Sequence, residues 1–100
     1  MADVVDEKDR NRFAVQLDGH EAELVYRLEG EHLILVHTGV PDELGGQGIG
    51  GELVRAAVDR AEKEGLTIAP WCPFARKWLE DHPDEAGRVE LDLSPRPTGA

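Results

Sequence analysis

Hydrophobic and polar residues alternate over two stretches near the start of the chain, which is the pattern of half-buried β-strands. Residues 12–17 put Phe13 on the same side as the other large apolar residues of that stretch, and residues 21–28 do the same with Leu24 and Tyr26. An Asp-Gly pair between the two stretches predicts a two-residue hairpin turn, because both residues tolerate positive φ. A Glu-Gly pair after the second stretch predicts another turn.

A longer apolar run, EHLILVHTGV, follows at residues 31–40 and is typical of a central strand that is covered on both faces. Pro41 ends this run, because proline has no N–H to give to a sheet ladder. Residues 12–40 therefore predict an antiparallel meander of three strands.

The hydrophobic period then changes from two to that of an amphipathic helix, which begins near Ile49 and ends at Gly65. The sequence LTIAP at 66–70 predicts a short strand. A second helix is expected over 74–81, and GRVELDL at 87–93 can add a final strand. The order β-β-β-α-β-α, with this optional last strand, predicts an α/β fold with a mixed central sheet and two main helices.

One hundred residues make one small domain. Residues 1–10 are charged and aperiodic, which predicts a flexible N-terminus. The folded domain is expected over 11–93, and SPRPTGA at 94–100 is typical of a disordered tail.

The charge balance disfavours several partner classes. Twenty-one acidic against 11 basic residues give a net charge of −10, which opposes binding to nucleic acid and to anionic membranes. The same charge either serves solubility alone or favours an amine substrate. One cysteine and four histidines without ligand spacing predict no disulfide and no metal site. The lack of a long apolar run and the acidic start predict a cytoplasmic protein.

The stretch LGGQGIGGELV, residues 44–54, lies between a predicted strand and a predicted helix, where phosphate-binding loops occur. A P-loop needs a lysine and a Ser or Thr after its last glycine, but here Gly51-Glu52 follows. A dinucleotide site needs an acidic residue about 20 positions later, and none is found there. A turn that binds no ligand stays open as an alternative.

The element order, this loop and the sequence from His37 to Glu85 resemble the GNAT acyltransferases, and more narrowly the small GNAT-like proteins that carry a cysteine after the fourth strand. The resemblance implies acetyl-CoA as co-substrate, with its pyrophosphate on the backbone amides of the loop. The first position of the family's loop motif, normally Arg or Gln, is Gly45 here, which predicts weaker cofactor binding. The residues implied in cofactor binding are Val40, Gly45, Gly46, Gln47, Gly48, Ile49, Gly50, Gly51, Phe74, Arg76 and Lys77.

Two further residues are candidates for catalysis. Cys72 takes the place of the family's asparagine, and the tyrosine that supplies a proton in the wider superfamily is Leu79 here. A cysteine at a helix N-terminus has a raised thiolate fraction, which suits a thiol that accepts the acetyl group or assists its departure; a small buried residue is the alternative. His37 is a candidate general base, or else a histidine bonded to the backbone.

Two functional hypotheses follow. The first is an N-acetyltransferase that moves acetyl from coenzyme A to an amine, on a small molecule, a polyamine or a lysine-bearing protein. The second is a non-catalytic module that binds or senses acyl-CoA. The bare Asp18-Gly19 turn occupies the place where larger relatives build an acceptor pocket, so the acceptor site is open or completed by a second subunit, in a monomer or weak dimer.

Overall fold

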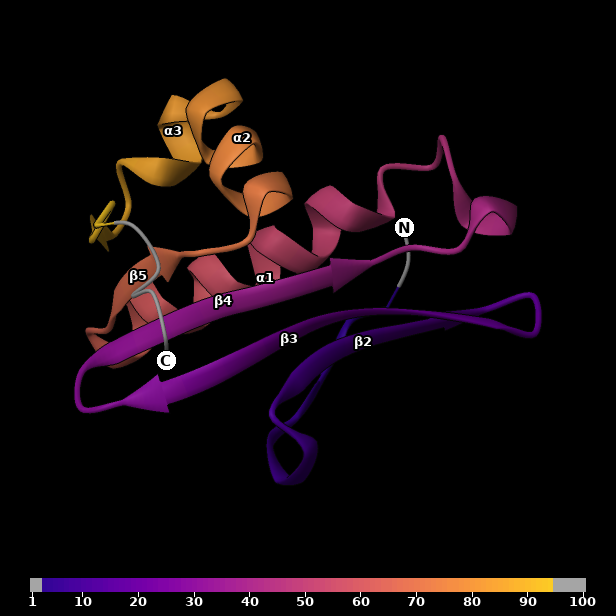
Figure 1. Ribbon diagram of the computed structural model, residues 1–100, viewed down its shortest axis with the longest axis horizontal. Helices are drawn as coiled ribbons and strands as arrows, with labels where there is room; N and C mark the ends of the chain where they lie inside the picture. Colours follow the sequence, from indigo (N-terminus) through magenta and orange to yellow (C-terminus); the bar gives the residue numbers. More distant parts are fainter. Residues whose placement is uncertain (1–2, 95–100) are drawn as a thin grey trace.

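A single six-stranded sheet, with its strands in sequence order from β1 to β6, forms the body of the protein (Figure 1). The computed structural model describes residues 3–94. The strands are β1 (Val5–Glu7), β2 (Arg12–Leu17), β3 (His20–Glu29), β4 (His32–Gly39), β5 (Thr67–Pro70) and β6 (Glu90–Leu91). The α-helices are α1 (Ile49–Glu64), α2 (Pro73–Asp81) and α3 (Pro83–Ala86), and 3₁₀ turns cover Lys8–Arg10 and Asp42–Leu44.

The predicted mixed sheet is confirmed. Strands β2, β3 and β4 pair antiparallel, and β4 pairs parallel with β5 after the crossover through α1. The turn between β2 and β3 has φ of 53° at Asp18 and 78° at Gly19, so both residues are left-handed, as the hairpin pattern requires. The final strand β6 also forms, but only two residues of it pair with β5, in parallel.

Within its described part, residues 3–10, the N-terminal segment departs from the predicted flexible stretch at 1–10. Residues 5–7 form the edge strand β1, which pairs antiparallel with β2. Asp6 holds this strand against the rest of the protein, because its carboxylate accepts hydrogen bonds from the Tyr26 hydroxyl at 2.6 Å and from Arg60 at 3.0 Å. The charge of Asp6, which suggested a solvent-exposed terminus, thus pairs with groups that are buried or nearly so. The predicted tail at 94–100 lies, apart from Ser94, outside the described residues.

The helix α1 covers one face of the sheet and buries its apolar side there. Leu53, Val54 and Val58 are fully buried against sheet residues such as Leu24 and Leu33. Gly65, with φ of 69°, ends the helix, and its N–H donates to the carbonyl of Ala61.

Strands β4 and β5 separate before β4 ends. Their pairing ends at Leu35 and Pro70, whereas β4 continues to Gly39. The Cys72 N–H still donates to the Leu35 carbonyl at 2.9 Å, and α2 begins at the next residue. The end of β4, the start of α1 and one side of α2 therefore meet in one place. The predicted helix ends at Asp81 as expected, but a short additional helix, α3, follows it.

Candidate functional site

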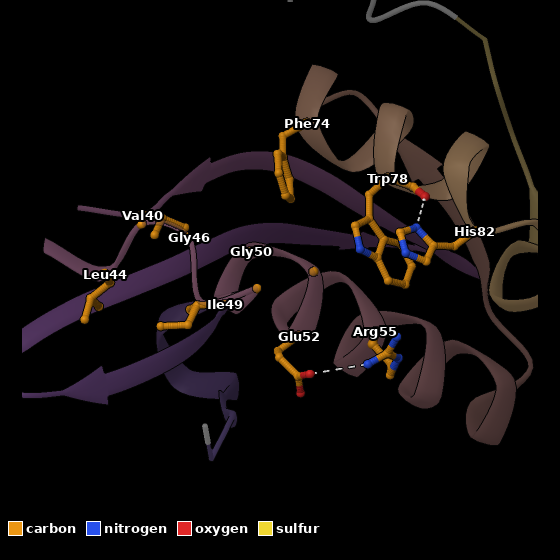
Figure 2. A pocket seen from close by; sticks show the side chains of 13 residues that line it. Val40, Leu44, Gly46, Ile49, Gly50, Glu52, Arg55, Phe74, Trp78 and His82 are labelled. Atoms are coloured by element: carbon orange, nitrogen blue, oxygen red, sulfur yellow. Dashed lines mark hydrogen bonds and ion pairs between the residues drawn. The ribbon is translucent and has the colours of Figure 1, made fainter. Parts of the chain in front are cut away.

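A groove of about 540 Å³ lies between the end of β4, the glycine loop, the first turns of α1 and one side of α2 (Figure 2). Glycines form its floor, and aromatic and apolar side chains form its walls. Its lining residues are Val40, Leu44, Gly45, Gly46, Gly48, Ile49, Gly50, Gly51, Glu52, Arg55, Phe74, Trp78 and His82.

The glycine loop leaves the start of α1 uncapped and open to this groove. Gly46 and Gly48 have φ of 77° and 74°, a left-handed conformation that glycine adopts without strain. The first intrahelical bond runs from the Glu52 N–H to the Gly48 carbonyl at 3.0 Å, and no side chain in the described residues caps the helix. The amides that precede Glu52 in the helix therefore have no intrahelical partner, and this arrangement attracts an anion.

Two of the glycines in α1 have a packing role that the sequence did not indicate. A Cβ placed on Gly50 would lie 2.6 Å from Cζ of Phe74, and one on Gly51 would lie 2.5 Å from Nε1 of Trp78. Both distances are shorter than van der Waals contact. The missing side chains at these positions therefore let the aromatic rings of α2 lie directly against the first turn of α1.

The end of the groove away from Val40 carries a stack of side chains from α1, α2 and the residue after α2 (Figure 2). The rings of Trp78 and His82 are 4.0 Å apart and nearly parallel, and Nδ1 of His82 donates to the Trp78 carbonyl at 2.8 Å. The guanidinium of Arg55 lies 5.5 Å from the Trp78 ring and pairs with Glu85 at 2.6 Å and Glu52 at 3.3 Å.

Five residues that line the groove are not among the predicted cofactor residues: Leu44, Glu52, Arg55, Trp78 and His82. Phe74, Trp78 and His82 are spaced by four along the chain, which places them on one side of α2 and of the residue that follows it. That spacing shows that the three share one side, but it does not show that this side lies against the first turn of α1.

Cys72 lies beside the groove and does not line it. It is 5% exposed, it is the N-cap residue of α2, and its Sγ is 3.2 Å from the Thr38 hydroxyl. The structure therefore joins Cys72 to the last part of β4, at the point where β4 and β5 separate. A thiol and a hydroxyl within hydrogen-bond distance can share a proton there.

The structure does not bring His37 to Cys72. Adjacent strand residues project to opposite faces of a sheet, and Thr38, which contacts Cys72, is paired with the buried Leu24. His37 is instead exposed, opposite Val25 on the other face. A role as general base toward a group at Cys72 gains no support from this position.

Three of the predicted cofactor residues also lie off the groove. The Arg76 guanidinium donates to the Leu93 carbonyl at 2.5 Å and does not line the groove. Lys77 pairs with Asp81 at 2.9 Å, and this hydrogen bond raises the pKa of the Lys77 ammonium. Gln47 is exposed in the loop, and the remaining predicted cofactor residues line the groove.

Comparisons with known proteins agree on one family. The sequence profile of the GCN5-related N-acetyltransferases matches residues 12–88. Protein NATD1 of Mus musculus is 35% identical over 80 residues, which cover 77% of this chain and 73% of the mouse protein. Protein NATD1 of Homo sapiens is 36% identical over 77 residues, which cover 74% of this chain and 68% of the human protein.

A solved structure supports the same assignment. The chain is similar to the NMR solution structure of a GCN5-like protein from Staphylococcus aureus, with a TM-score of 0.72 and 32% identity. The match covers 99% of this chain and 97% of the other. Within residues 3–94, no helix has the length and apolar character that a membrane crossing needs.

Proposed function

Because the chain belongs to the GCN5-related N-acetyltransferase family, we propose that it binds acetyl-CoA in this groove and transfers the acetyl group to an amine. One observation carries the proposal: the uncapped N-terminus of α1 opens into a 540 Å³ groove, in a protein of net charge −10 that otherwise repels polyanions. Backbone amides and the helix dipole attract phosphate there without needing a lysine or an arginine.

The reaction requires the acceptor nitrogen to attack the thioester carbonyl carbon, after which the C–S bond breaks and the coenzyme leaves as a thiolate. That thiolate needs a proton, and the amine must lose one. We assign Cys72, with Thr38, to the proton transfer at the leaving sulfur, because the thiol and hydroxyl lie 3.2 Å apart where β4 and β5 separate. Tyr26 is remote from this role, since its hydroxyl is bonded to Asp6 and Arg60.

The proposed acceptor is a cationic amine, on a small molecule, a polyamine or a lysine side chain, because the acidic surface attracts such groups. The proposed compartment is the cytoplasm, which suits a chain whose one cysteine is an unpaired thiol.

Calorimetric titration with acetyl-CoA tests the binding site through a matched pair of variants. Gly46 and Gly65 have φ of 77° and 69°, with open space around each, so alanine strains both positions equally. Gly46 lies in the groove, and Gly65 ends α1 at the far side. Gly46→Ala should weaken binding, while Gly65→Ala should lower stability alone. Equal affinities in both variants would rule out the loop as the cofactor site.

Turnover distinguishes the enzyme from the second candidate, a module that only binds acyl-CoA. The burial of Cys72 and of Leu79, at the superfamily's tyrosine position, favours this second candidate. Release of free coenzyme A thiol is followed with a panel of amines, for the wild type and for Cys72→Ala and Cys72→Ser. We expect turnover that falls in both variants. Tight binding without turnover on any amine would leave the binding module as the function.

A further inference from the structure

Trp78 is a buried side chain whose indole nitrogen has no hydrogen-bond acceptor among residues 3–94. Trp78 is 9% exposed, and its Nε1–H donates to no acceptor within residues 3–94. Every fully buried side-chain nitrogen or oxygen in that part of the chain has a partner. The indole nitrogen is therefore one that the groove can reach, as expected from its place in the groove wall. A buried indole usually finds an acceptor, so an acceptor outside the protein is expected.

This donor faces the start of α1. Nε1 would lie 2.5 Å from a Cβ on Gly51, and Figure 2 shows the nitrogen edge of the indole turned toward the first turn of the helix. The amides of that turn have no intrahelical partner, and the helix dipole adds positive potential at the same place. The Glu52 carboxylate, which also lines the groove, is directed to Arg55 and not to the indole.

We propose that the Trp78 indole N–H donates a hydrogen bond to the phosphate oxygens of the ligand, together with the first amides of α1. The class of ligand is a phosphate ester or diphosphate, so the inference rests on the proposed coenzyme A binding and adds to it a residue from a different helix. Gly51 is then glycine because any side chain would separate this donor from the helix N-terminus.

The indole is held in place before a ligand arrives. His82 stacks on it at 4.0 Å, and the same histidine is fixed by its bond to the Trp78 carbonyl. Arg55 lies over the ring at 5.5 Å, and two carboxylates hold that guanidinium. A donor that needs no reordering contributes more of its hydrogen bond to affinity. The loop positions that line the groove are glycines and the apolar Ile49, and none of them offers a side-chain donor.

Proton–nitrogen NMR of the two tryptophan indoles tests the proposal on the unmodified chain, with Trp71→Phe used only to assign the signals. Coenzyme A and inorganic pyrophosphate should both move the Trp78 indole signal, and pantetheine, which carries no phosphate, should leave it unchanged. Pyrophosphate has no ring, so its effect is free of ring currents. If coenzyme A moves the backbone amides of the loop but leaves the Trp78 indole unmoved, this proposal fails and the proposed function stands. If neither the loop amides nor the Trp78 indole responds to coenzyme A or to pyrophosphate, this proposal and the proposed function are both overturned.

A second test removes the donor and keeps an aromatic ring. Trp78→Phe should weaken coenzyme A binding by about tenfold, the lower end expected for a hydrogen bond to a charged group. Trp71→Phe is the matched control, since Trp71 does not line the groove, and it should bind within about threefold of wild type. Circular dichroism checks that both variants fold. Equal affinities of Trp78→Phe and wild type for coenzyme A would overturn the proposal.

Discussion

Gly50 and Gly51 are adjacent helical glycines that should respond oppositely to alanine. In a helix interior, alanine is favoured over glycine by up to about 1 kcal/mol, so propensity alone predicts that both substitutions stabilise α1. Contacts separate the two positions. A Cβ on Gly50 would meet the tip of Phe74 at 2.6 Å, and that ring is 45% exposed. The Phe74 ring can therefore rotate into solvent, and Gly50→Ala keeps most of the stability that alanine gains over glycine in a helix.

A Cβ on Gly51 has no such escape. It would lie 2.5 Å from Nε1 and 3.2 Å from Cδ1 of Trp78, a side chain that is 9% exposed and stacked on His82. Overpacking of this kind costs about 1–3 kcal/mol, which exceeds the propensity gain. We therefore expect Gly51→Ala to be less stable than Gly50→Ala by about 2 kcal/mol, or roughly 10 °C in thermal midpoint for a domain of this size.

Thermal and urea unfolding, followed by far-ultraviolet circular dichroism, measure the difference. The double variant Gly51→Ala/Trp78→Leu isolates the cause, because the cost of Gly51→Ala should vanish once the indole is gone. If Gly51→Ala is as stable as Gly50→Ala, or if its cost persists without the indole, the packing explanation for these glycines is wrong.

Four other predictions follow from particular contacts. Arg60→Met removes hydrogen bonds of 2.8 Å to the Tyr26 hydroxyl and 3.0 Å to Asp6. It should therefore lower the free energy of unfolding, measured with urea, by about 1–3 kcal/mol and speed amide exchange in β1. Burial, and then the hydrogen bond to Asp6, raise the pKa of Tyr26 from its ordinary value of 10 to about 12. The neutral phenol therefore contributes its full stability below about pH 10, and this contribution is lost as pH rises through 12. The absorbance of tyrosinate should show this late titration. Arg88 lowers the pKa of Glu62 and Glu85, so their contribution is present above about pH 4.5 and is lost as pH falls, and Arg88→Gln should flatten the dependence of the thermal midpoint on acid pH. Gly45→Gln restores the side chain that the family usually has at this loop position, so it should tighten acetyl-CoA binding measured by calorimetry. The backbone accepts it, because φ of −65° suits any residue and the new Cβ meets only the Asp42 carbonyl, at 3.1 Å.

The sequence predicted most of the fold because local rules decided it. The period-two pattern, the Asp18-Gly19 turn and the helix end at Gly65 each depend on neighbours in the chain. The ordered N-terminus could not be predicted in this way. Asp6 is held by Tyr26 and Arg60, which lie 20 and 54 positions away, and charge alone gave no sign of these partners.

The candidate site divides along the same line. The loop from Gly45 to Gly51 lies between a strand and a helix as the sequence predicts, and all of these residues except Gln47 line the groove, while their binding of a cofactor stays a prediction. The positions of the side chains around the loop could not be predicted from the sequence. Arg76 and Lys77 have the right charge but face Leu93 and Asp81, while Trp78 and His82 reach the groove because α2 lies across the first turn of α1. The spacing of residues along the chain does not determine how one helix packs on another.

Titration of the backbone amide spectrum with acetyl-CoA is the sharpest test of binding at the glycine loop, because it locates the binding site as well as detecting binding. The account predicts that the largest shifts fall on the amides from Gly46 to Gly51, with smaller shifts at Val40 and along the groove side of α2. Shifts that leave this loop unchanged and gather on the opposite face of the sheet, around His37 and Val25, would contradict it.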